Sequence, residues 1–443
     1  MALGIDNPIG CCSILLPIAY RFLSIAYGLL PIATLPLCYS KSERKMPTLW
    51  EKAMYAWETR LTTRDTNRIV RPLDWGIEWT RDWPQVNGNF PSNPADLDDT
   101  RAEQYFRELN QRIVSDSDRF FSYATPSDFR LEERLPELFP TNLRQQRQLA
   151  KLDRQIRKGK LRPVPFLRFT SPVGTPYPEN DVVNARWFPA FDREGKPSQK
   201  AVIVLPQWNA DAFSHNALCH VMNRYGVSAL RLSKPYHDIR RPAEIERSDY
   251  AVSANIGRTL DSCRQGVIDI RCCLDWLEAQ GCRRFGILGT SLGSCYAFIA
   301  SAHDSRIEVN AFNHASTYFG DVVWTGQSTR HIRAAFENVM DLDRLRQIWL
   351  AISPMAYMKK FAAHRKKVLV VYAKYDLTFL RELSEQVVGQ FREHDIDFKA
   401  VALPCGHYTV GEVPFKFIDG WHLGSFIYSA FKQLEKQPLS SSD

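Results

Sequence analysis

The 443-residue sequence lacks the short motifs by which many cofactor and nucleic-acid sites are recognised. It contains no Walker phosphate-binding loop, no glycine-rich dinucleotide fingerprint with its acidic partner, and no histidine and cysteine spacing that would hold a structural metal. A zinc finger, an RNA-recognition signature and a helix-turn-helix are missing as well. We therefore expect no cofactor, no bound metal and no nucleic-acid partner.

Internal repeats and low-complexity segments are also missing, and the composition excludes disordered and fibrous proteins. Hydrophobic residues make up 44% of the chain and charged residues 24%, as in ordinary globular proteins. Most of the net charge of +8 comes from residues 144–162, where eight Lys or Arg accompany the single acid Asp153. This segment is either a solvated helix face or a surface for anionic lipid headgroups or another acidic partner.

The ten cysteines do not suit a disulfide framework. Three lie within the first 38 residues, and the seven in the second half cannot all pair among themselves. Cys272 and Cys273 are adjacent in a helix-like segment and do not face a common partner. Reduced thiols and a cytoplasmic location are therefore expected. Cys295 and Cys405, which lie beside motifs described below, are interpreted as packing residues.

A long hydrophobic run is nearly absent as well. The uncharged, mostly apolar run at 22–38 has 17 residues, is interrupted by glycine and proline, and is short for a bilayer span. Three basic residues follow it, which would leave the rest of the chain in the cytoplasm if the run were inserted. Residues 1–45 are thus a membrane-associated segment, a signal peptide, which fits less well, or a stretch that precedes a natural start at Met46.

Residues 46–162 are expected to form a helical N-terminal extension. Helical patterns occur at 100–124 and 139–160. Strand patterns at 166–170 and 182–188, with turn residues between them, then predict a hairpin that leads into a sheet.

The most informative segment is G-T-S-L-G at 289–293, because an apolar strand pattern precedes it and a small-residue helical run follows. In a nucleophile elbow, a serine between strand and helix has a strained backbone, and glycines two residues on either side allow close approach of neighbouring chain. The alternative is an ordinary glycine-rich turn. Ser291 is therefore the candidate nucleophile.

A serine nucleophile needs a base and a group that orients the base. The strand-like run 366–372 is followed by Asp376, and the run 398–403 is followed by His407. Both side chains should lie at the carboxyl edge of a parallel sheet. Asp376 as a helix cap and His407 as a solvated or structural residue are the alternatives.

Two other histidines, His237 and His314, also follow strand patterns and compete with His407. His314 follows the run 306–312, a place where some sheets of this kind carry the acid, but no carboxylate follows it until Asp321. Asp376 is therefore the better candidate for the acid.

The three motifs occur in the order serine, acid, histidine, and from about 201 to 421 the chain resembles an α/β-hydrolase-fold serine hydrolase. The resemblance implies a triad of Ser291, Asp376 and His407. It also implies an α/β fold with a mostly parallel central sheet, flanking helices and a helical cap insertion at about 317–361. The catalytic domain is then expected at 163–437.

An oxyanion that forms during attack needs two donors. The resemblance implies the backbone N–H of Leu292 as the first and the loop after strand 201–205 as the source of the second. Pro206 has no N–H, so the amides of Gln207 and Trp208 are the candidates, with the side chain of Asn209 as an alternative. Trp208 could equally be an aromatic anchor for the loop.

The loop at 231–242 offers candidate substrate contacts. His237, Arg240 and Arg241 could bind an anionic group, since arginine grips carboxylate or phosphate through two hydrogen bonds. Alternatively their charges are solvated or paired with nearby acids. The aromatic residues of 317–361 either line a lid for an acyl chain or form plain core.

These features lead to an expected function. The chain is a hydrolase of carboxylic esters, lipid-like esters among them, that works through an acyl-enzyme on a small-molecule ester. Acyl transfer with the same triad, or a catalytically silent module that binds a ligand or protein, are the alternatives. Association with a membrane surface would use the N-terminal segment or the basic segment 144–162.

Overall fold

The computed structural model describes residues 48–436, except 87, 89, 140–142 and 193. The predicted segment 1–45 therefore lies outside the described residues. Contacts divide the chain into two units, Met1–Lys52 and Ala53–Asp443, and the architecture below is that of the second unit. Among the described residues, no helix has both the length and the apolar character needed to cross a bilayer.

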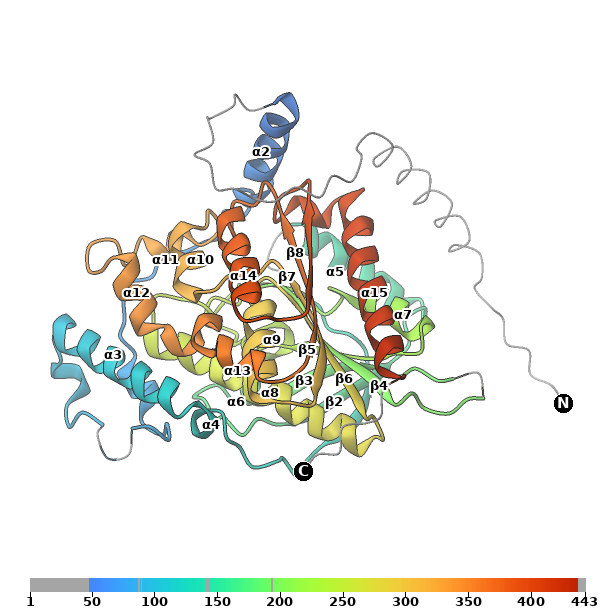
Figure 1. Ribbon diagram of the computed structural model, residues 1–443, viewed down its shortest axis with the longest axis horizontal. Helices are drawn as coiled ribbons and strands as arrows, with labels where there is room; N and C mark the ends of the chain where they lie inside the picture. The colour runs from blue at the N-terminus through green and yellow to red at the C-terminus, as the bar shows by residue number, and fades with distance from the viewer. Residues whose placement is uncertain (1–47, 87, 89, 140–142, 193, 437–443) are drawn as a thin grey trace. The chain divides into compact units, whose positions relative to one another are not determined.

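A nine-stranded sheet organises this unit, with strand order β1-β2-β3-β5-β4-β6-β7-β8-β9 (Figure 1). The strands are β1 (Arg130–Arg134), β2 (Val164–Thr170), β3 (Val182–Phe188), β4 (Lys200–Leu205), β5 (Ser228–Ser233), β6 (Arg284–Thr290), β7 (Ile307–Asn313), β8 (Lys367–Ala373) and β9 (Phe398–Leu403). The six strands from β5 to β9 in this order are parallel, and β1, β2 and β3 are antiparallel to their neighbours. The predicted mostly parallel sheet is confirmed, as is the antiparallel hairpin of β2 and β3.

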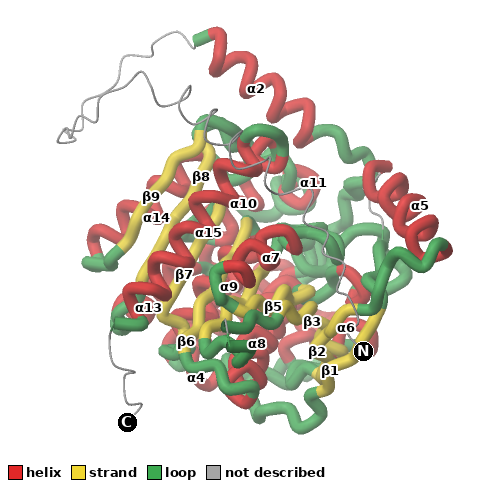
Figure 2. Tube along the Cα trace, turned by 90° about the vertical axis from the view of Figure 1, so that its right-hand side faces the viewer, coloured by secondary structure: helices red, strands yellow, loops and turns green. Residues whose placement is uncertain are grey.

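Helices cover both faces of the sheet (Figures 1 and 2). On one face lie α7 (Asn216–Arg224) and α15 (Phe415–Leu434), and on the other lie α8 (Ile256–Ala279), α9 (Leu292–His303), α13 (Met358–Ala362) and α14 (Arg381–Glu393). Strand β4 shows why, because its side chains alternate between two cores. Ile203 and Leu205 belong to the hydrophobic core on the side of α8 and α9. Val202 and Val204 belong to the core on the opposite side, where they pack with α7 and α15.

Strand β1 was not predicted. Its sequence, RLEER, is charged and its side chains are exposed or half-buried, so no apolar alternation marks it. Charge suits a strand at the edge of a sheet, where it discourages pairing with another chain. Because β1 pairs with β2, the sheet begins inside the segment 46–162 that the sequence indicated as a helical extension.

The helical patterns of that segment correspond to real helices. The helices of the extension are α2 (Leu49–Thr62), η1 (Ile77–Thr80), η2 (Pro94–Asp96), α3 (Asp99–Ser115), α4 (Ser117–Phe120) and α5 (Leu143–Arg157). Short helices elsewhere in the chain are α6 (Pro178–Asp181), η3 (Asp238–Arg240) and η6 (Thr409–Gly411). Helix α5 contains the first part of the basic run 144–162, up to Arg157, and its described side chains are mostly exposed.

The insertion between β7 and β8 is helical, as predicted. It contains α10 (Phe319–Thr325), α11 (Arg330–Arg333), α12 (Leu342–Ile348), η4 (Leu350–Ile352), η5 (Pro354–Tyr357) and α13. The ring of Trp349 is buried between those of Phe319 and Phe336, at centroid distances of 5.4 and 5.6 Å. These aromatic side chains therefore form a core within the insertion.

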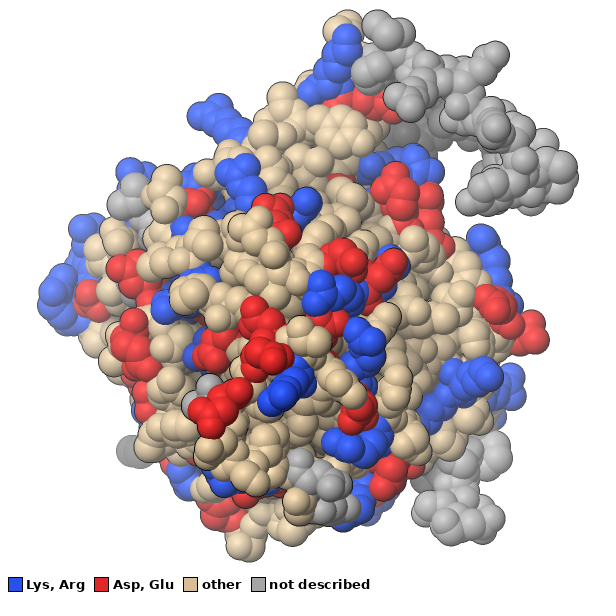
Figure 3. All heavy atoms as spheres, turned by 90° about the vertical axis from the view of Figure 1, so that its left-hand side faces the viewer, with Lys and Arg blue, Asp and Glu red and all other residues tan. Residues whose placement is uncertain are grey.

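Helix α3 packs against this insertion. Asn110 donates to the carbonyl oxygen of Ile348 at 2.8 Å and accepts from the N–H of Ala351 at 2.7 Å. Glu103 pairs with Arg344. On the face shown in Figure 3, acidic and basic side chains are interspersed, so the excess positive charge is not gathered there.

Candidate active site

Ser291 lies at the sharp turn between β6 and α9. Its φ of 57° and ψ of −120° are rare for a residue with a side chain and store backbone strain. A Cβ on Gly289 would lie 2.3 Å from the carbonyl oxygen of Gly293, and one on Gly293 would lie 2.3 Å from that of Leu205. Both glycines are thus required by close approach of backbone, which is the geometry of a nucleophile elbow.

Asp376 follows β8 and has a different partner on each carboxylate oxygen. Oδ1 accepts the backbone N–H groups of Thr378 and Phe379, each at 2.7 Å. Oδ2 accepts from Nδ1 of His407 at 3.0 Å. These two N–H groups belong to the turn 377–380, and α14 begins only at Arg381, so Asp376 caps a turn and not the helix that was the alternative. The bonds to Oδ1 leave Oδ2 for the histidine.

His407 follows β9 and is held by packing as well as by Asp376. The ring of Phe379 stacks on it at 5.4 Å with an interplanar angle of 2°. Burial acts to lower the pKa of His407, but the charge and hydrogen bond of Asp376 and the charge of Glu58 outweigh it and raise the pKa above 6.5. Burial acts to raise the pKa of Asp376, but His407 and His314 hold it well below its usual range.

The structure brings His314, one of the rivals of His407, to the same carboxylate. His314 Nδ1 lies 2.9 Å from Asp376 Oδ2, although off the direction of a good hydrogen bond. The two imidazole rings are 4.5 Å apart. Burial, and then the charge of His407, lowers the pKa of His314. The strand-end position was the sequence signal for this residue.

These three side chains also form a possible ligand set. His314, Asp376 and His407 are the single group in the described ranges whose His, Cys, Asp or Glu ligand atoms lie within 4.8 Å of one another. A cation bound there would compete with the bond between His407 and Asp376, because Asp376 Oδ2 already serves both rings. The absence of a metal stays a prediction.

Glu58 of α2 fastens the loop that carries His407. Its carboxylate is fully buried and accepts the backbone N–H of Tyr408 at 2.9 and 3.1 Å and that of Thr409 at 3.0 Å. A Cβ on Gly406 would lie 2.4 Å from this carboxyl group. Sequence reasoning missed Glu58, because nothing near it in the chain indicates a partner so distant in sequence.

The predicted oxyanion donors lie in the elbow itself, at Leu292, and in the loop that follows β4. Helix α9 begins at Leu292, whose N–H belongs to the first turn and needs a partner from outside the helix. Buried Lys234 Nζ donates to the carbonyl oxygens of Pro206 at 2.6 Å and Gln207 at 3.0 Å. Since C=O and N–H of a trans peptide point in opposite directions, the N–H groups of Gln207 and Trp208 face away from Lys234. Lys234 is a second residue that sequence reasoning missed.

The side chains of Trp208 and Asn209 hold this loop in place through hydrogen bonds to Ser248. Trp208 Nε1 donates to the carbonyl oxygen of Ser248 at 2.9 Å, and Asn209 Oδ1 accepts the N–H of Ser248 at 2.7 Å. The indole of Trp208 therefore anchors the loop, and its backbone N–H remains a candidate oxyanion donor. Asn209 has a φ of 56°, so its side chain and its backbone both serve the turn.

The candidate substrate contacts of the 231–242 loop are mostly interior. Arg240 is completely buried, pairs with Asp269 at 2.9 Å and donates to backbone carbonyl oxygens. His237 is buried as well, with Nδ1 2.8 Å from the carbonyl oxygen of Pro235. Arg241 is half-buried and donates to the carbonyl oxygen of Glu246. The structure thus places His237 and Arg240 in the interior, away from any surface that a substrate could reach.

The seven described cysteines are free thiols. Cys405 is fully buried, and burial raises the pKa of its thiol, which keeps it protonated. Cys295 donates to the carbonyl oxygen of Ile352 at 3.2 Å. Both observations fit packing roles.

The chain was compared with known proteins. No known protein-family profile matches it. It is 30% identical over 131 residues to a curated protein of Escherichia coli described as "Uncharacterized 31.7 kDa protein in traX-finO intergenic region". That alignment covers 29% of this chain, and the chain spans 41% of the length of this relative.

Several solved structures are similar. Acetyl xylan esterase 1 from Thermoanaerobacterium sp. has 14% identity and a TM-score of 0.48, over 74% of this chain and 93% of that chain. Est1E from Butyrivibrio proteoclasticus with bound ferulic acid has 14% identity and a TM-score of 0.41, over 56% and 96%. Acylaminoacyl peptidase from Pyrococcus horikoshii has 10% identity and a TM-score of 0.45, over 63% and 42%.

The fold assignment depends on the chain's own architecture. A parallel sheet between two helical layers, an elbow after β6, and later strand ends that carry Asp376 and His407 make this an α/β-hydrolase fold.

Proposed function

We propose that this protein hydrolyses carboxylic esters through an acyl-enzyme on Ser291. The observation that carries the proposal is the 3.0 Å contact between His407 Nδ1 and Asp376 Oδ2, at the same sheet edge as a serine in a strained elbow. A base oriented by a buried carboxylate, at the same sheet edge as a strained serine, is what nucleophilic catalysis at a carbonyl uses.

In the first half-reaction, Ser291 Oγ bonds to the carbonyl carbon, and its proton passes to Nε2 of His407. The carbonyl electron pair moves onto oxygen, where the N–H of Leu292 and that of Gln207 or Trp208 would donate to it. Asp376 keeps Nδ1 protonated and stabilises the imidazolium. Collapse of the intermediate breaks the bond to the alcohol oxygen, which takes the proton from His407.

In the second half-reaction, water takes the place of the alcohol. His407 removes a proton from water as the water oxygen attacks the acyl carbon. The new intermediate collapses to a carboxylic acid, and the proton returns from His407 to Ser291 Oγ. Ester and water are thus converted to acid and alcohol, with the enzyme restored.

A fluorophosphonate probe tests the proposal directly. We expect covalent labelling of Ser291 in the intact protein and none in Ser291→Ala, with similar melting temperatures. Hydrolysis of 4-nitrophenyl esters of increasing acyl length should show the same dependence on Ser291. A folded protein that is neither labelled nor active would contradict the proposal and favour a silent binding module.

The same assay separates hydrolysis from acyl transfer. An added alcohol or thiol that captures the acyl group faster than water would identify a transferase, because the first half-reaction is common to both. We propose a small-molecule ester as the substrate, and membrane-surface association through α5 remains a proposal that vesicle sedimentation would test.

A further inference from the structure

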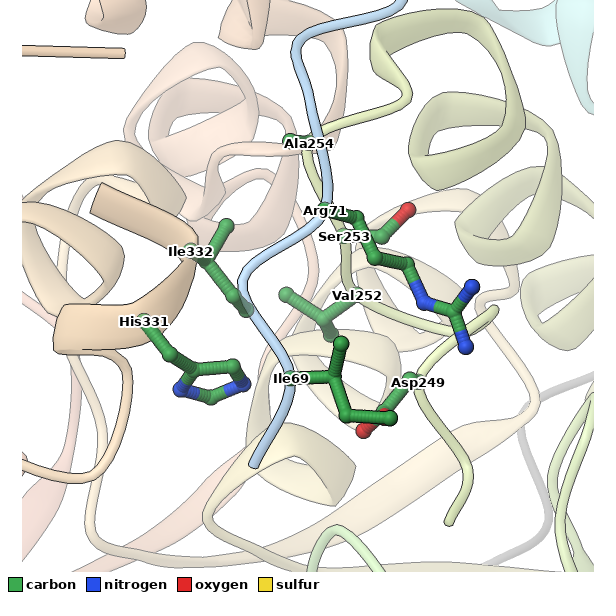
Figure 4. Close-up of a pocket in the computed structure, with 8 residues that line it drawn as sticks. All are labelled: Ile69, Arg71, Asp249, Val252, Ser253, Ala254, His331 and Ile332. Carbon is green, nitrogen blue, oxygen red and sulfur yellow. The ribbon is translucent and has the colours of Figure 1, made fainter. Parts of the chain in front are cut away.

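A pocket opens beside the candidate catalytic loops (Figure 4). It is small and open to solvent, with a volume of about 10 Å³. The lining combines apolar side chains with charged and polar ones, namely Ile69, Arg71, Asp249, Val252, Ser253, Ala254, His331 and Ile332.

Contacts connect this pocket with the catalytic machinery. Arg68, from the segment that leads into the pocket, donates through Nη2 to the hydroxyl of Tyr408 at 3.2 Å, and Tyr408 follows the proposed base. The indole of Trp208, in the oxyanion loop, stacks on the pocket residue His331 at 6.0 Å. The pocket itself is lined by residues 69–71, 249–254 and α11, and these two contacts connect its neighbours with the base loop and the oxyanion loop.

Arginine exceeds acid around the pocket. Arg247 pairs with Asp65 at 3.5 Å and with Asp249 at 3.3 Å, and Arg68 lies 4.0 Å from Asp65. Arg71, which lines the pocket together with Asp249, adds a third guanidinium group. The side chains of Arg247 and Arg68 are only 4% and 8% exposed, so solvent screens them little.

The hydrogen bonding of the arginines is incomplete. The Nε atoms of Arg68 and Arg71 are buried and have no hydrogen-bond acceptor among the described residues. A buried cation without its full set of acceptors is costly unless a ligand supplies them. Burial, together with the positive charge of Arg247 and Arg68, lowers the pKa of His331 to about 4, as a cationic environment would.

We infer that this pocket binds an anionic group of the substrate, a carboxylate or phosphate held by Arg71, which lines it, and by the neighbouring Arg68. This inference rests on the proposed function and specifies its substrate class. It moves the anion site from Arg240, which is occupied by Asp269, to arginines of the N-terminal segment. Arginine forks match both anions, so the chemistry they share is the proposal.

The test compares ester pairs that differ only in charge. The anion is on the acyl side in mono-4-nitrophenyl glutarate and its methyl ester, and on the alcohol side in 4-acetoxybenzoate and its methyl ester. We expect kcat/KM at least about tenfold higher for the anionic member of one pair, equivalent to one charge-assisted contact. In Arg71→Gln and Arg68→Gln this ratio should fall at least about fivefold.

Several measurements keep the result independent of folding. Exposed Arg381, which pairs with Glu385 on α14, provides the control Arg381→Gln, for which rates and ratio should match the wild type. Arg71→Lys should retain part of the ratio. In the wild type itself, raising ionic strength should reduce the preference for the anionic ester, and glutarate and inorganic phosphate are compared as competitive inhibitors to decide between the two anions.

The outcomes separate this inference from the proposed function. Equal kcat/KM within both pairs in the wild type, or a ratio that neither Arg71→Gln nor Arg68→Gln alters, would overturn the anion site and leave ester hydrolysis standing. No hydrolysis of any of the four esters, with no labelling of Ser291, would overturn both.

Discussion

The buried carboxylate of Glu58 accepts the backbone N–H of Tyr408, the residue that follows His407. A helix near the start of the described chain thus fixes the loop that carries the proposed base. Burial raises the pKa of Glu58, although hydrogen bonds from Tyr408 and Thr409 act in the opposite direction.

Removing Glu58 should therefore impair catalysis and stability together. Glu58→Ala leaves two buried N–H groups without an acceptor, which costs about 1–3 kcal/mol for each group. We expect a lower melting temperature and a fall in kcat that exceeds any change in KM, because the base is misplaced. Glu58→Gln, which keeps one acceptor oxygen, should recover part of kcat.

Arg60→Ala, on an exposed position of the same helix, is the matched control and should leave kcat unchanged. If Glu58→Ala melts early but keeps a normal kcat at low temperature, Glu58 supports the fold only.

The pH dependence should report His407. Catalysis requires the neutral imidazole, and the pKa of His407 is raised above 6.5, so kcat/KM should rise with pH to a midpoint above 6.5. In Asp376→Asn the midpoint should move below that of the wild type, because burial then dominates, and kcat should fall by about 10⁴. A wild-type midpoint below 6.5 in the pH–rate profile would contradict the ion pair.

Stability should depend on pH with opposite signs for the two partners. Asp376 has a depressed pKa in the fold, so it stabilises above its ordinary value of 3.8 and loses this effect as pH falls toward its folded pKa. His407 has a raised pKa, so its contribution is complete below 6.5 and is lost as pH rises through the folded value. Chemical denaturation at a series of pH values would measure the free energy of unfolding at the acidic and the alkaline end. In Asp376→Asn this free energy should depend less on pH at both ends.

The two histidines that contact Asp376 should differ in how much they contribute to kcat. His407→Ala should lower kcat by about 10⁴, since it removes the base. His314→Ala should cost much less, because His314 contacts Asp376 Oδ2 and the ring of His407 but is not the proposed base. Steady-state kinetics of the two variants compares them, and the reverse order would make His314 the base.

The elbow glycine should not tolerate a methyl group. A Cβ on Gly289 would lie 2.3 Å from the carbonyl oxygen of Gly293, so Gly289→Ala must displace backbone and should lower stability by several kcal/mol or prevent folding. Gly389 is the control, because it lies within α14 and a Cβ there meets nothing within 4 Å. Gly389→Ala should be neutral or stabilise by about 0.5–1 kcal/mol. Thermal denaturation distinguishes them, and equal effects would contradict the packing argument.

Most of the central sheet could be predicted from sequence. Strands β4, β6 and β8 are buried on both faces and form short apolar runs, and β9 at the sheet edge is a similar run that is only partly buried. The residues just after such runs must lie at one edge of a parallel sheet. Because of that relation, the sequence could predict that Ser291, Asp376 and His407 form one triad. Strand β1, with exposed charged side chains, carried no such pattern.

The candidate site was less predictable where its parts come from distant segments. Local patterns along the chain determine which elements form and which residues end them, because burial and backbone strain act over a few neighbours. They do not report which N–H a buried Glu58 accepts, which carbonyls Lys234 fixes, or that Arg68 and not Arg240 stands beside the pocket. Those partnerships depend on tertiary packing, since a carboxylate or guanidinium is satisfied by whichever group the fold brings within about 3 Å of it.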